Sequence, residues 1–492
     1  MAMNTDSRII TDAANAEPAR VPAGANVSSV DVIIIGTGQA APALAVALAQ
    51  GGERVAVIEA GLVGGSCVNV GCTPTKTLRK SARVAQMART ARDYGVDVGP
   101  VRVDFPAAMA RMRQRVDASR GGLESWLASE TNIRLYRAWG SFEGRDGADF
   151  IVRAGADLLR ARRVYLNTGT RAFVPPIPGL AALPFLDNTS LLQLTELPEH
   201  LIIIGGSYIG LEMGQIFRRL GARVSIVQTG SRVAAREDPE VSAAITAFLE
   251  REGVDVHCAV AIESAEPAAH GSGQGIRLSL AGGRELTGSH VLVATGRLPN
   301  TDRLNLASVG LPTDGRGFIN TDGRLRTAVD GIWALGDING RGAFTHTSYD
   351  DHEIALAEQG GSAWRDAEER ILAYAMFTDP PLGRVGITLA EARRRVRDGA
   401  RILYAQWAMK DVSRAKEEGE TDGLITLIVD AASERFLGAS ILGINGDEIV
   451  QVISTFMATG ASWRVLQQAL PIHPTVTEFL PTILGRLKPL TP

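Results

Sequence analysis

The sequence predicts an α/β fold in which two parallel-sheet modules are followed by a smaller α+β domain. The first observation is a strand, glycine turn, helix and strand pattern that begins near Val30. The second is the return of this pattern near Leu201. The third is a change after about residue 367, where strands and helices continue without a glycine-rich turn. Two βαβ patterns so far apart in the chain indicate two separate parallel sheets.

The first module begins with the apolar, β-branched run Val30–Ile35, which is typical of a buried strand. A glycine turn follows, then an alanine-rich helix over Ala40–Gln50 and a second buried strand over Arg54–Glu59. This order predicts one complete βαβ unit.

The turn of the first module carries small residues at Gly36, Gly38 and Ala41, as a Rossmann-like dinucleotide-binding turn does. Such residues let the backbone approach a pyrophosphate at the positive end of the helix. Glu59 ends the next strand, where its carboxylate can accept hydrogen bonds from a ribose. The alternative, a glycine turn without a ligand, is disfavoured by this acid.

The second module repeats the pattern with strands over Leu201–Ile204 and Arg223–Val227 and a helix over Leu211–Leu220. Its turn has Ser207 at the middle glycine position. We expect the turn to bind a second dinucleotide through Gly205, Ser207, Tyr208 and Gly210.

The second module differs from the first at the end of its second strand, where Gln228 replaces the acid. A carboxylate there would repel the 2′-phosphate of NADPH, whereas Gln228 with the nearby Arg232 and Arg236 would accept it. The sequence therefore favours NADPH, with NADH possible. Solvated loop charges are the alternative interpretation of the two arginines.

Three more strand-like runs end in a glycine turn: Val164–Gly169, Val291–Gly296 and Gly331–Asp337. We expect them to complete the two sheets. The candidate cofactor-binding residues at their ends are Thr168, Gly169, Gly296, Arg297, Gly336 and Asp337.

The last third of the chain predicts antiparallel strands over Leu424–Asp430 and Leu437–Leu442. Helical patterns follow over Asp447–Thr459 and Ser462–Ala469. The absence of a phosphate-binding turn in this part indicates an α+β domain with another role.

The chain contains only three cysteines, and two of them, Cys67 and Cys72, lie close together just after the first βαβ unit. A helix start there would lower the pKa of a thiol and produce a reactive thiolate near neutral pH. Gly71 and Pro74 are consistent with the distorted turn that a disulfide between these positions requires. A structural disulfide and half of a metal site are the alternatives. We predict no metal site, because a zinc site needs four ligands and no second cysteine pair exists.

The composition is that of an ordinary globular protein of 492 residues with a net charge of −3, which indicates no nucleic-acid partner. No apolar run approaches the ~18 residues that a membrane span requires. The first 28 residues hold no signal-peptide pattern. We expect a cytoplasmic protein without a membrane partner.

These motifs recur in an order that resembles the pyridine nucleotide–disulfide oxidoreductases, which include glutathione reductase, dihydrolipoamide dehydrogenase and mercuric reductase. The resemblance runs from Val30 to the end of the chain. The segments Cys67–Lys76 and Phe377–Gly386 are most similar to the mercuric-reductase-like branch, and the run Gly336–Tyr349 resembles its bacterial oxidant-resistance members.

The resemblance implies an FAD enzyme in which Cys67 is the interchange thiol and Cys72 lies against the flavin. It implies that Lys76 stands beside the flavin ring, paired with Glu212. It also implies that Tyr208 covers the nicotinamide pocket. Further FAD contacts are expected from Gly65, Ser66 and Asp337.

The element His473-Pro-Thr-Val-Thr-Glu478 matches a motif of this family. The resemblance implies that His473 exchanges a proton with the interchange thiol and that Glu478 orients the imidazole. In the family the partner subunit supplies this element. We therefore expect a homodimer whose active sites are shared between the subunits.

The resemblance divides the chain as follows. Residues 29–176 and 300–367 form the FAD-binding domain, and residues 177–299 form the NAD(P)-binding domain between them. Residues 368–492 form the dimerisation domain, and residues 1–28 form a flexible tail.

The final electron acceptor is expected to be a small oxidant or a metal ion. Mercuric reductases carry a further cysteine pair near the C-terminus, and this sequence has no cysteine after Cys258. We expect Cys258 to be a buried apolar side chain. The alternatives are a dihydrolipoamide-dehydrogenase-like or glutathione-reductase-like disulfide reductase, a flavin-centred quinone or copper(II) reductase, and a binding subunit of a larger complex.

Overall fold

The computed structural model describes residues 27–271, 273–361 and 365–492. The expected N-terminal tail therefore lies outside the described residues up to residue 26. Val27 and Ser28, which were predicted to belong to the tail, instead form strand β1 (Val27–Ser29), so the prediction is wrong at these two residues. The described chain divides into two units of three segments each. Unit 1 contains residues 27–73, 114–171 and 297–370, and unit 2 contains residues 74–113, 172–296 and 371–492.

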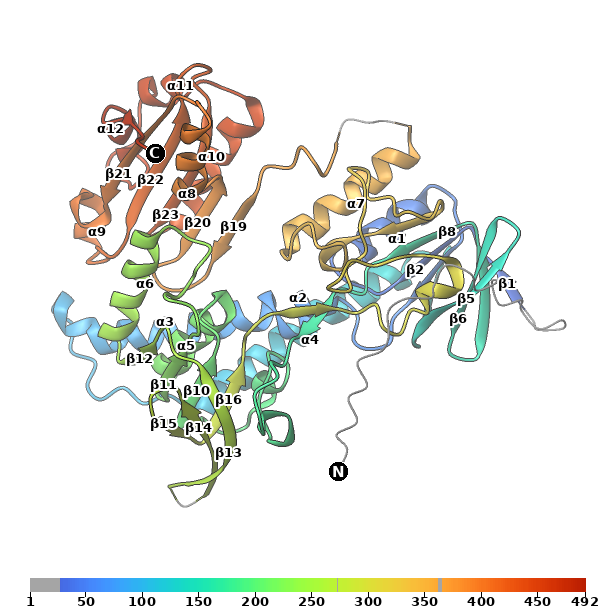
Figure 1. The fold of residues 1–492 in the computed structure, drawn as a ribbon, viewed down its shortest axis with the longest axis horizontal. Coiled ribbons are helices and arrows are strands. Elements are labelled where there is room, and N and C mark those ends of the chain that lie inside the picture. Colours follow the sequence, from blue (N-terminus) through green and yellow to red (C-terminus); the bar gives the residue numbers. More distant parts are fainter. Residues whose placement is uncertain (1–26, 272, 362–364) are drawn as a thin grey trace, which may run out of the picture. The chain divides into compact units, whose positions relative to one another are not determined.

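Unit 1 is built on a five-stranded parallel sheet of order β18-β8-β2-β3-β4 (Figure 1). The strands are β2 (Val32–Ile35), β3 (Val55–Ile58), β4 (Ile133–Tyr136), β8 (Arg163–Leu166) and β18 (Ile332–Ala334). Both faces of β2 and β3 are buried, which explains their unbroken apolar sequences.

One face of this sheet packs against helices α1 (Ala41–Gln50) and α7 (Thr345–Gln359). On the other face lies a second sheet of order β1-β7-β6-β5. Its antiparallel strands are β5 (Gly140–Asp146), β6 (Asp149–Ala154) and β7 (Asp157–Ala161). The carboxyl ends of β2 and β3 therefore lie at one edge of a sheet whose two faces are both covered.

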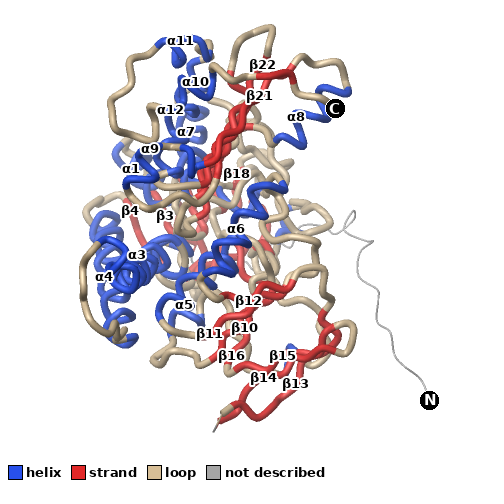
Figure 2. Tube along the Cα trace, turned by 90° about the vertical axis from the view of Figure 1, so that its left-hand side faces the viewer, coloured by secondary structure: helices blue, strands red, loops and turns tan. Residues whose placement is uncertain are grey.

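Unit 2 contains a four-stranded parallel sheet of order β12-β11-β10-β16 (Figure 2). The strands are β10 (His200–Ile204), β11 (Arg223–Val227), β12 (Val254–His257) and β16 (His290–Val293). Helices α5 (Tyr208–Leu220) and α6 (Pro239–Arg251) connect them. An antiparallel sheet of β13 (Ile262–His270), β14 (Gly273–Leu280) and β15 (Arg284–Gly288) stands between β12 and β16 in sequence.

The C-terminal part of unit 2 is a six-stranded antiparallel sheet of order β19-β20-β23-β22-β21-β24. The strands are β19 (Ala373–Met376), β20 (Leu382–Gly386), β21 (Ile402–Ala408), β22 (Leu424–Asp430), β23 (Phe436–Leu442) and β24 (Lys488–Pro489). Its helices are α8 (Leu389–Arg397), α9 (Ser413–Glu417), α10 (Gly446–Thr459), α11 (Trp463–Gln468) and α12 (Phe479–Leu484).

The remaining elements are α2 (Gly65–Val70), α3 (Cys72–Thr90), α4 (Phe105–Ala128), β9 (Thr170–Ala172) and β17 (Arg297–Pro299). The mixed α/β fold that the sequence predicted is confirmed, and each predicted strand and helix is present with small changes at its ends. The two three-stranded antiparallel insertions were not predicted. None of the helices in the described ranges is both long and apolar enough to cross a membrane.

Candidate active site

The two cysteines lie on either side of a break between two helices. Cys67 is in α2 and Cys72 begins α3. Gly71 separates the helices with φ −134° and ψ −119°. A Cβ at Gly71 would lie 2.8 Å from the Ser66 carbonyl oxygen and 3.1 Å from the Cys67 Cα. Glycine is needed here because the chain passes so close to its own preceding turn, and this turn brings the two thiols together.

Thr345, the first residue of α7, contacts both sulfur atoms. Its hydroxyl donates a hydrogen bond to Cys67 Sγ at 3.0 Å and lies 3.2 Å from Cys72 Sγ. The sequence analysis missed this residue. Its signal was weak, because a threonine near the end of a glycine-rich run has no distinctive spacing to a distant cysteine.

The pKa of the Cys67 thiol is raised above its usual value, first by its hydrogen bond with Cys72 and then by burial. The predicted lowering of a thiol pKa is therefore wrong for Cys67. The physical reason is that the Cys67 thiol is hydrogen-bonded to Cys72 and partly buried, and both effects disfavour its deprotonation. Cys67 is half-buried and Cys72 is exposed.

The first glycine-rich turn has the close packing of a phosphate-binding loop. A Cβ on Gly36, which has φ +93°, would lie 2.4 Å from the carbonyl oxygen of Asn167. A Cβ on Gly38 would lie 2.5 Å from Oδ1 of the same asparagine, which also accepts a hydrogen bond from Ala41 N at 3.3 Å. No side chain at Gly36 or Gly38 therefore covers the backbone at the start of α1, so a pyrophosphate can approach it closely.

Glu59 lies at the end of β3 and accepts two hydrogen bonds from Thr37. These bonds join Glu59 Oε2 to the Thr37 amide at 2.9 Å and to its hydroxyl at 2.5 Å. Gly65 packs onto the same turn, because a Cβ there would lie 2.9 Å from the Gly38 Cα. Ser66 follows Gly65 in the first turn of α2. These positions fit the ribose and pyrophosphate of a dinucleotide.

Asp337 follows strand β18 and accepts a hydrogen bond from the Thr170 hydroxyl at 3.1 Å. Arg297 donates in turn to that hydroxyl at 2.6 Å. Burial raises the pKa of the Asp337 carboxyl. Gly336 N donates to the buried Asp351 carboxylate at 2.6 Å, which fixes the turn. A partly buried carboxylate with few donors is suited to accept hydrogen bonds from a bound polyhydroxyl chain.

Thr168 and Gly169 follow β8. The Thr168 hydroxyl donates to the Asn300 carbonyl at 3.0 Å, and Gly169 has φ +64°. They lie next to Asn167 in sequence, at the same edge of the sheet as the first turn. These residues of unit 1, which follow strands β2, β3, β8 and β18, thus fit FAD at the carboxyl ends of the parallel strands.

The second glycine-rich turn has the same local design. A Cβ on Gly205 would lie 2.4 Å from the Ala294 carbonyl oxygen, and one on Gly210 would lie 2.0 Å from the Gly205 carbonyl oxygen. Ser207 precedes the first residue of α5. Gln228 Oε1 accepts a hydrogen bond from Gly206 N at 2.9 Å. The turn therefore fits a second dinucleotide.

The two arginines near the expected 2′-phosphate site, Arg232 and Arg236, differ in their surroundings. Arg232 Nη2 donates to the carbonyl oxygens of Ala235 and Glu237 at 3.1 and 3.3 Å. Arg236 is exposed. Gly296, at the end of the strand run after β16, has φ +152°. Arg236 is thus the more available of the two arginines.

Lys76 and Glu212 form the ion pair that the sequence analysis expected. Lys76 Nζ lies 2.8 Å from Glu212 Oε2, and Glu212 Oε1 accepts a hydrogen bond from Phe377 N at 2.8 Å. The ammonium group also lies 4.4 Å from the centre of the Phe377 ring. Lys76 is on α3, the helix that Cys72 begins.

Three further predicted residues have clear surroundings. Tyr208 donates its hydroxyl hydrogen to Glu237 at 2.8 Å. His473 Nδ1 lies 2.9 Å from Glu478 Oε2, and the imidazole side chain is 76% exposed. Cys258 is only half-buried, so the expectation of a buried apolar side chain is wrong. It follows the end of strand β12, where the chain leaves the sheet.

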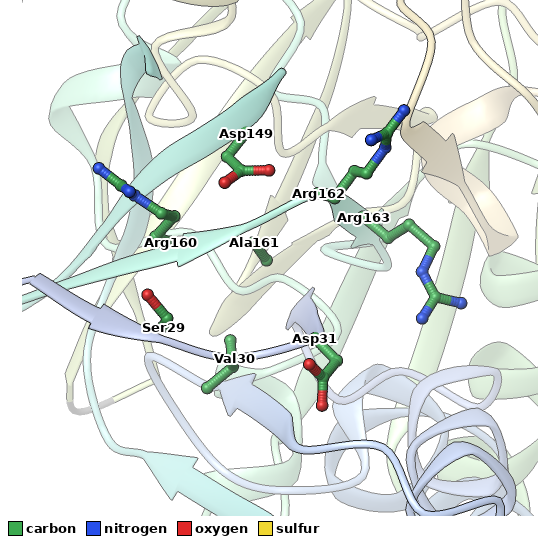
Figure 3. Close-up of a pocket in the computed structure, with 8 residues that line it drawn as sticks. All are labelled: Ser29, Val30, Asp31, Asp149, Arg160, Ala161, Arg162 and Arg163. Carbon is green, nitrogen blue, oxygen red and sulfur yellow. The ribbon is translucent and has the colours of Figure 1, made fainter. Parts of the chain in front are cut away.

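Unit 1 also has a surface pocket with a different lining (Figure 3). It is lined by Ser29, Val30, Asp31, Asp149, Arg160, Ala161, Arg162 and Arg163. None of these is a candidate site residue, and Asp31 is paired with Arg54 at 3.0 Å.

Two family models match the chain. The pyridine nucleotide-disulphide oxidoreductase model matches residues 30–357. The dimerisation domain model of the same family matches residues 372–483.

Known proteins resemble the chain over nearly its whole length. The probable pyridine nucleotide-disulfide oxidoreductase RclA of Escherichia coli is 33% identical over 460 residues, covering 93% of this chain and 99% of the relative. A mercuric reductase of Streptomyces lividans is 32% identical, covering 91% and 93%. The solved Cu(II) complex of the HOCl-induced flavoprotein disulfide reductase RclA from E. coli superimposes with a TM-score of 0.83 at 32% identity, covering 94% and 100%. The chain therefore belongs to the pyridine nucleotide-disulphide oxidoreductase family and is an FAD-dependent oxidoreductase.

Proposed function

We propose that this enzyme takes electrons from NADPH and delivers them through Cys67 and Cys72 to a metal ion, with copper(II) as the favoured acceptor. One observation carries the proposal. The two sulfurs are held together by the Gly71 turn and share the Thr345 hydroxyl, at 3.0 and 3.2 Å. With Cys72 exposed, this pair is a two-sulfur site open to a soft ion.

FAD would be held by Gly36, Gly38, Glu59 and Asp337, within a domain made of residues 29–176 and 300–367. When bound, it supplies hydride acceptance from a nicotinamide and two-electron transfer to a disulfide. The inserted domain of residues 177–299 would hold NADPH.

The cysteine chemistry balances without a further reactant. A Cys67–Cys72 disulfide that gains two electrons and two protons becomes two thiols. The two thiols can then reduce two copper(II) ions to copper(I), lose two protons and return to the disulfide. The raised pKa of Cys67 means that this thiol keeps its proton until an ion or another group takes it.

The Lys76–Glu212 pair would place a fixed positive charge beside the flavin, where it stabilises negative charge that develops on reduction. Gln228 and the exposed Arg236 favour NADPH over NADH. A neutral amide does not repel a 2′-phosphate, and an exposed guanidinium can pair with one.

We propose that the active enzyme is a homodimer, in which residues 368–492 form the interface. The dimerisation domain match supports this arrangement. His473, exposed and oriented by Glu478, would then serve the cysteine pair of the partner subunit as a proton donor and acceptor.

The relatives support the choice of acceptor. Copper(II) is bound in a solved structure of RclA, which matches this chain over 94% of its length. For mercury, the sequence offers no cysteine after Cys258, and so no second pair to pass the ion inward.

The test is NADPH oxidation by the purified yellow protein with copper(II), with copper(I) measured by a colorimetric chelator and no added thiol. We expect one NADPH consumed for two copper(I) formed. Cys67→Ser and Cys72→Ser should each lower the rate at least a hundredfold, whereas Cys258→Ser, the matched control, should leave it unchanged.

Other outcomes separate the alternatives. Copper(II) turnover that survives both substitutions would indicate a flavin-centred reductase. A fast rate only with mercury(II), oxidised glutathione or lipoamide would replace copper(II) as the acceptor. A flavin that NADPH does not reduce would contradict the proposal as a whole.

A further inference from the structure

A cluster of buried polar side chains lies next to the second glycine-rich turn, and we name it the Glu237 cluster. Its members are Tyr208, Glu237, Asp238, Tyr374 and Arg384. The side chains of Glu237, Asp238 and Arg384 are 0%, 2% and 1% exposed. Burying two carboxylates and one guanidinium is costly unless every group is paired, so the arrangement calls for an explanation.

The Glu237 carboxylate accepts three hydrogen bonds. Oε1 accepts from the hydroxyls of Tyr208 at 2.8 Å and Tyr374 at 2.7 Å. Oε2 accepts from Arg384 Nε at 2.6 Å. The two tyrosine rings lie 5.5 Å apart between centroids. Burial and the Glu237 carboxylate raise the pKa of both tyrosines, so both hydroxyls keep their hydrogens and remain donors.

Tyr208 is the member that connects this cluster to the nucleotide. It is the first residue of α5 and directly follows Ser207 of the phosphate-binding turn. Its ring is therefore fixed at one end by the helix start and at the other by Glu237. Any movement of the ring away from this position must break a hydrogen bond to a charged group.

Asp238 shares the arginine but has different partners. It accepts from Arg384 Nη2 at 3.1 Å and from the amides of Leu389 and Ala390, at the start of α8, at 3.3 Å. Its role is to hold the arginine and the helix. Glu237, by contrast, connects the arginine to Tyr208.

We propose that Glu237 is a positioning residue for Tyr208. Its hydrogen bond holds the ring in the nucleotide-free position, and NADPH binding must break that bond. The inference rests on the proposed binding of NADPH and on the role at the nicotinamide pocket that the family resemblance implies for Tyr208. Arg384 holds the Glu237 carboxylate in place through its hydrogen bond to Oε2, so the Glu237 cluster lowers the affinity for the dinucleotide and keeps the pocket covered until it binds.

The test measures NADP⁺ binding to the FAD-loaded protein by the change in flavin absorbance, so that no electrons are transferred. Tyr208→Phe keeps the ring and removes the hydroxyl. We expect the Kd for NADP⁺ to fall about tenfold, because this variant has no hydrogen bond to Glu237 that must break when the dinucleotide binds. A factor of about ten corresponds to one hydrogen bond to a charged group. Glu237→Gln should shift the Kd in the same direction by less. The double variant should bind no tighter than Tyr208→Phe alone.

Asp238→Asn is the matched control, because it disturbs the same arginine without removing a partner of Tyr208. It should lower the Tm and leave the Kd for NADP⁺ unchanged. Weaker or unchanged NADP⁺ binding in Tyr208→Phe would overturn the inference, as would an equal Kd shift in Asp238→Asn. Failure of the proposed function would give a different result, because NADPH would then not reduce the flavin of the unaltered enzyme.

Discussion

The two parallel-sheet modules of this chain use the same backbone arrangement and differ in a few side chains at matching positions. In both, a Cβ added at the first glycine of the turn would lie 2.4 Å from a carbonyl oxygen. That oxygen belongs to the residue that follows the strand paired with the first strand of the module, Asn167 after β8 or Ala294 after β16. In both, the residue that ends the second strand accepts a hydrogen bond from the turn at 2.9 Å. The acceptor is Glu59 in one module and Gln228 in the other.

The differences form matched pairs. In the first module Gly38 lies against the Asn167 side chain, and a Cβ added at Gly38 would lie 2.5 Å from Asn167 Oδ1. The second has Ser207 in place of Gly38 and the smaller Ala294 in place of Asn167. The first module has Ala41 and the second Gly210, whose Cβ would meet the Gly205 carbonyl oxygen at 2.0 Å. The comparison teaches that the first glycine is constrained in the same way in both modules, whereas the constraints on the other small positions differ between them.

Breaking the shared feature should give the largest effect. In Gly36→Ala and Gly205→Ala, the new Cβ would lie 2.4 Å from a carbonyl oxygen, at a residue with a positive φ. We expect each substitution to raise the local conformational free energy by about 2–6 kcal/mol. We expect Gly36→Ala to purify without flavin. We expect Gly205→Ala to stay yellow and to lose flavin reduction by NADPH at least a hundredfold. Absorbance spectra and stopped-flow reduction measure both.

Gly52→Ala is the control for this comparison. Gly52 has φ +90° but open space where a Cβ would point, so it carries the backbone strain without the contact. It should retain FAD. Loss of FAD in Gly52→Ala to the same extent would show that strain alone, and not the approach to Asn167, explains the first glycine.

The second prediction exchanges the residue that ends the second strand. Gln228→Glu should lower kcat/KM for NADPH relative to NADH by about tenfold to a hundredfold, because a carboxylate would face the 2′-phosphate. The hydrogen bond to Gly206 N can persist, as Glu59 keeps its own to Thr37 N. Steady-state kinetics with both dinucleotides measure the ratio. An unchanged ratio would mean that Gln228 does not contact this part of the dinucleotide.

Much of this comparison could be predicted from the sequence. The strands over Arg223–Val227 and Leu424–Asp430 have the expected ends, because buried runs of β-branched residues have few alternatives. The Lys76–Glu212 pair also formed as expected, at 2.8 Å, because the family motif fixes both positions.

Other parts could not be predicted, because they depend on contacts between distant segments. Thr345 meets the sulfur of Cys67, which lies 278 positions away in sequence. Glu237 and Arg384 are 147 positions apart, and a charged residue in a sequence is expected to be solvated. The raised pKa of Cys67 depends on Cys72 and on burial, neither of which helix position alone reveals.

The third prediction tests the matched pair in the first module. Asn167→Ala removes hydrogen bonds to Leu335 O at 2.7 Å and from Ala41 N at 3.3 Å, and should lower the free energy of unfolding by about 2 kcal/mol. Gly38→Ser should weaken FAD binding strongly in the unaltered chain and much less in Asn167→Ala, which reproduces the second module. A double-mutant cycle on the Kd for FAD measures the coupling. Additive effects would contradict the pairing.

The smallest effect should come from an element that only the first module has, strand β18 with Asp337 after it. Burial raises the pKa of Asp337, whereas the Thr170 hydrogen bond and Arg297 oppose that shift. The folded protein without FAD therefore holds this proton more tightly than the unfolded chain does. The contribution of Asp337 to stability is fully present below the ordinary aspartate pKa of about 4 and is lost as the pH rises through the raised value.

Asp337→Asn removes this titration. The difference in Tm between Asp337→Asn and the unaltered FAD-free protein should therefore increase from pH 4 to pH 8, in favour of the variant. The same substitution should weaken FAD binding, because an uncharged amide accepts hydrogen bonds less strongly than a carboxylate. Thermal unfolding across this pH range, with and without FAD, measures both. A variant that is less stable without FAD at pH 8 would show that Asp337 holds the β18 turn together, and the two modules would then differ in architecture more than in ligand.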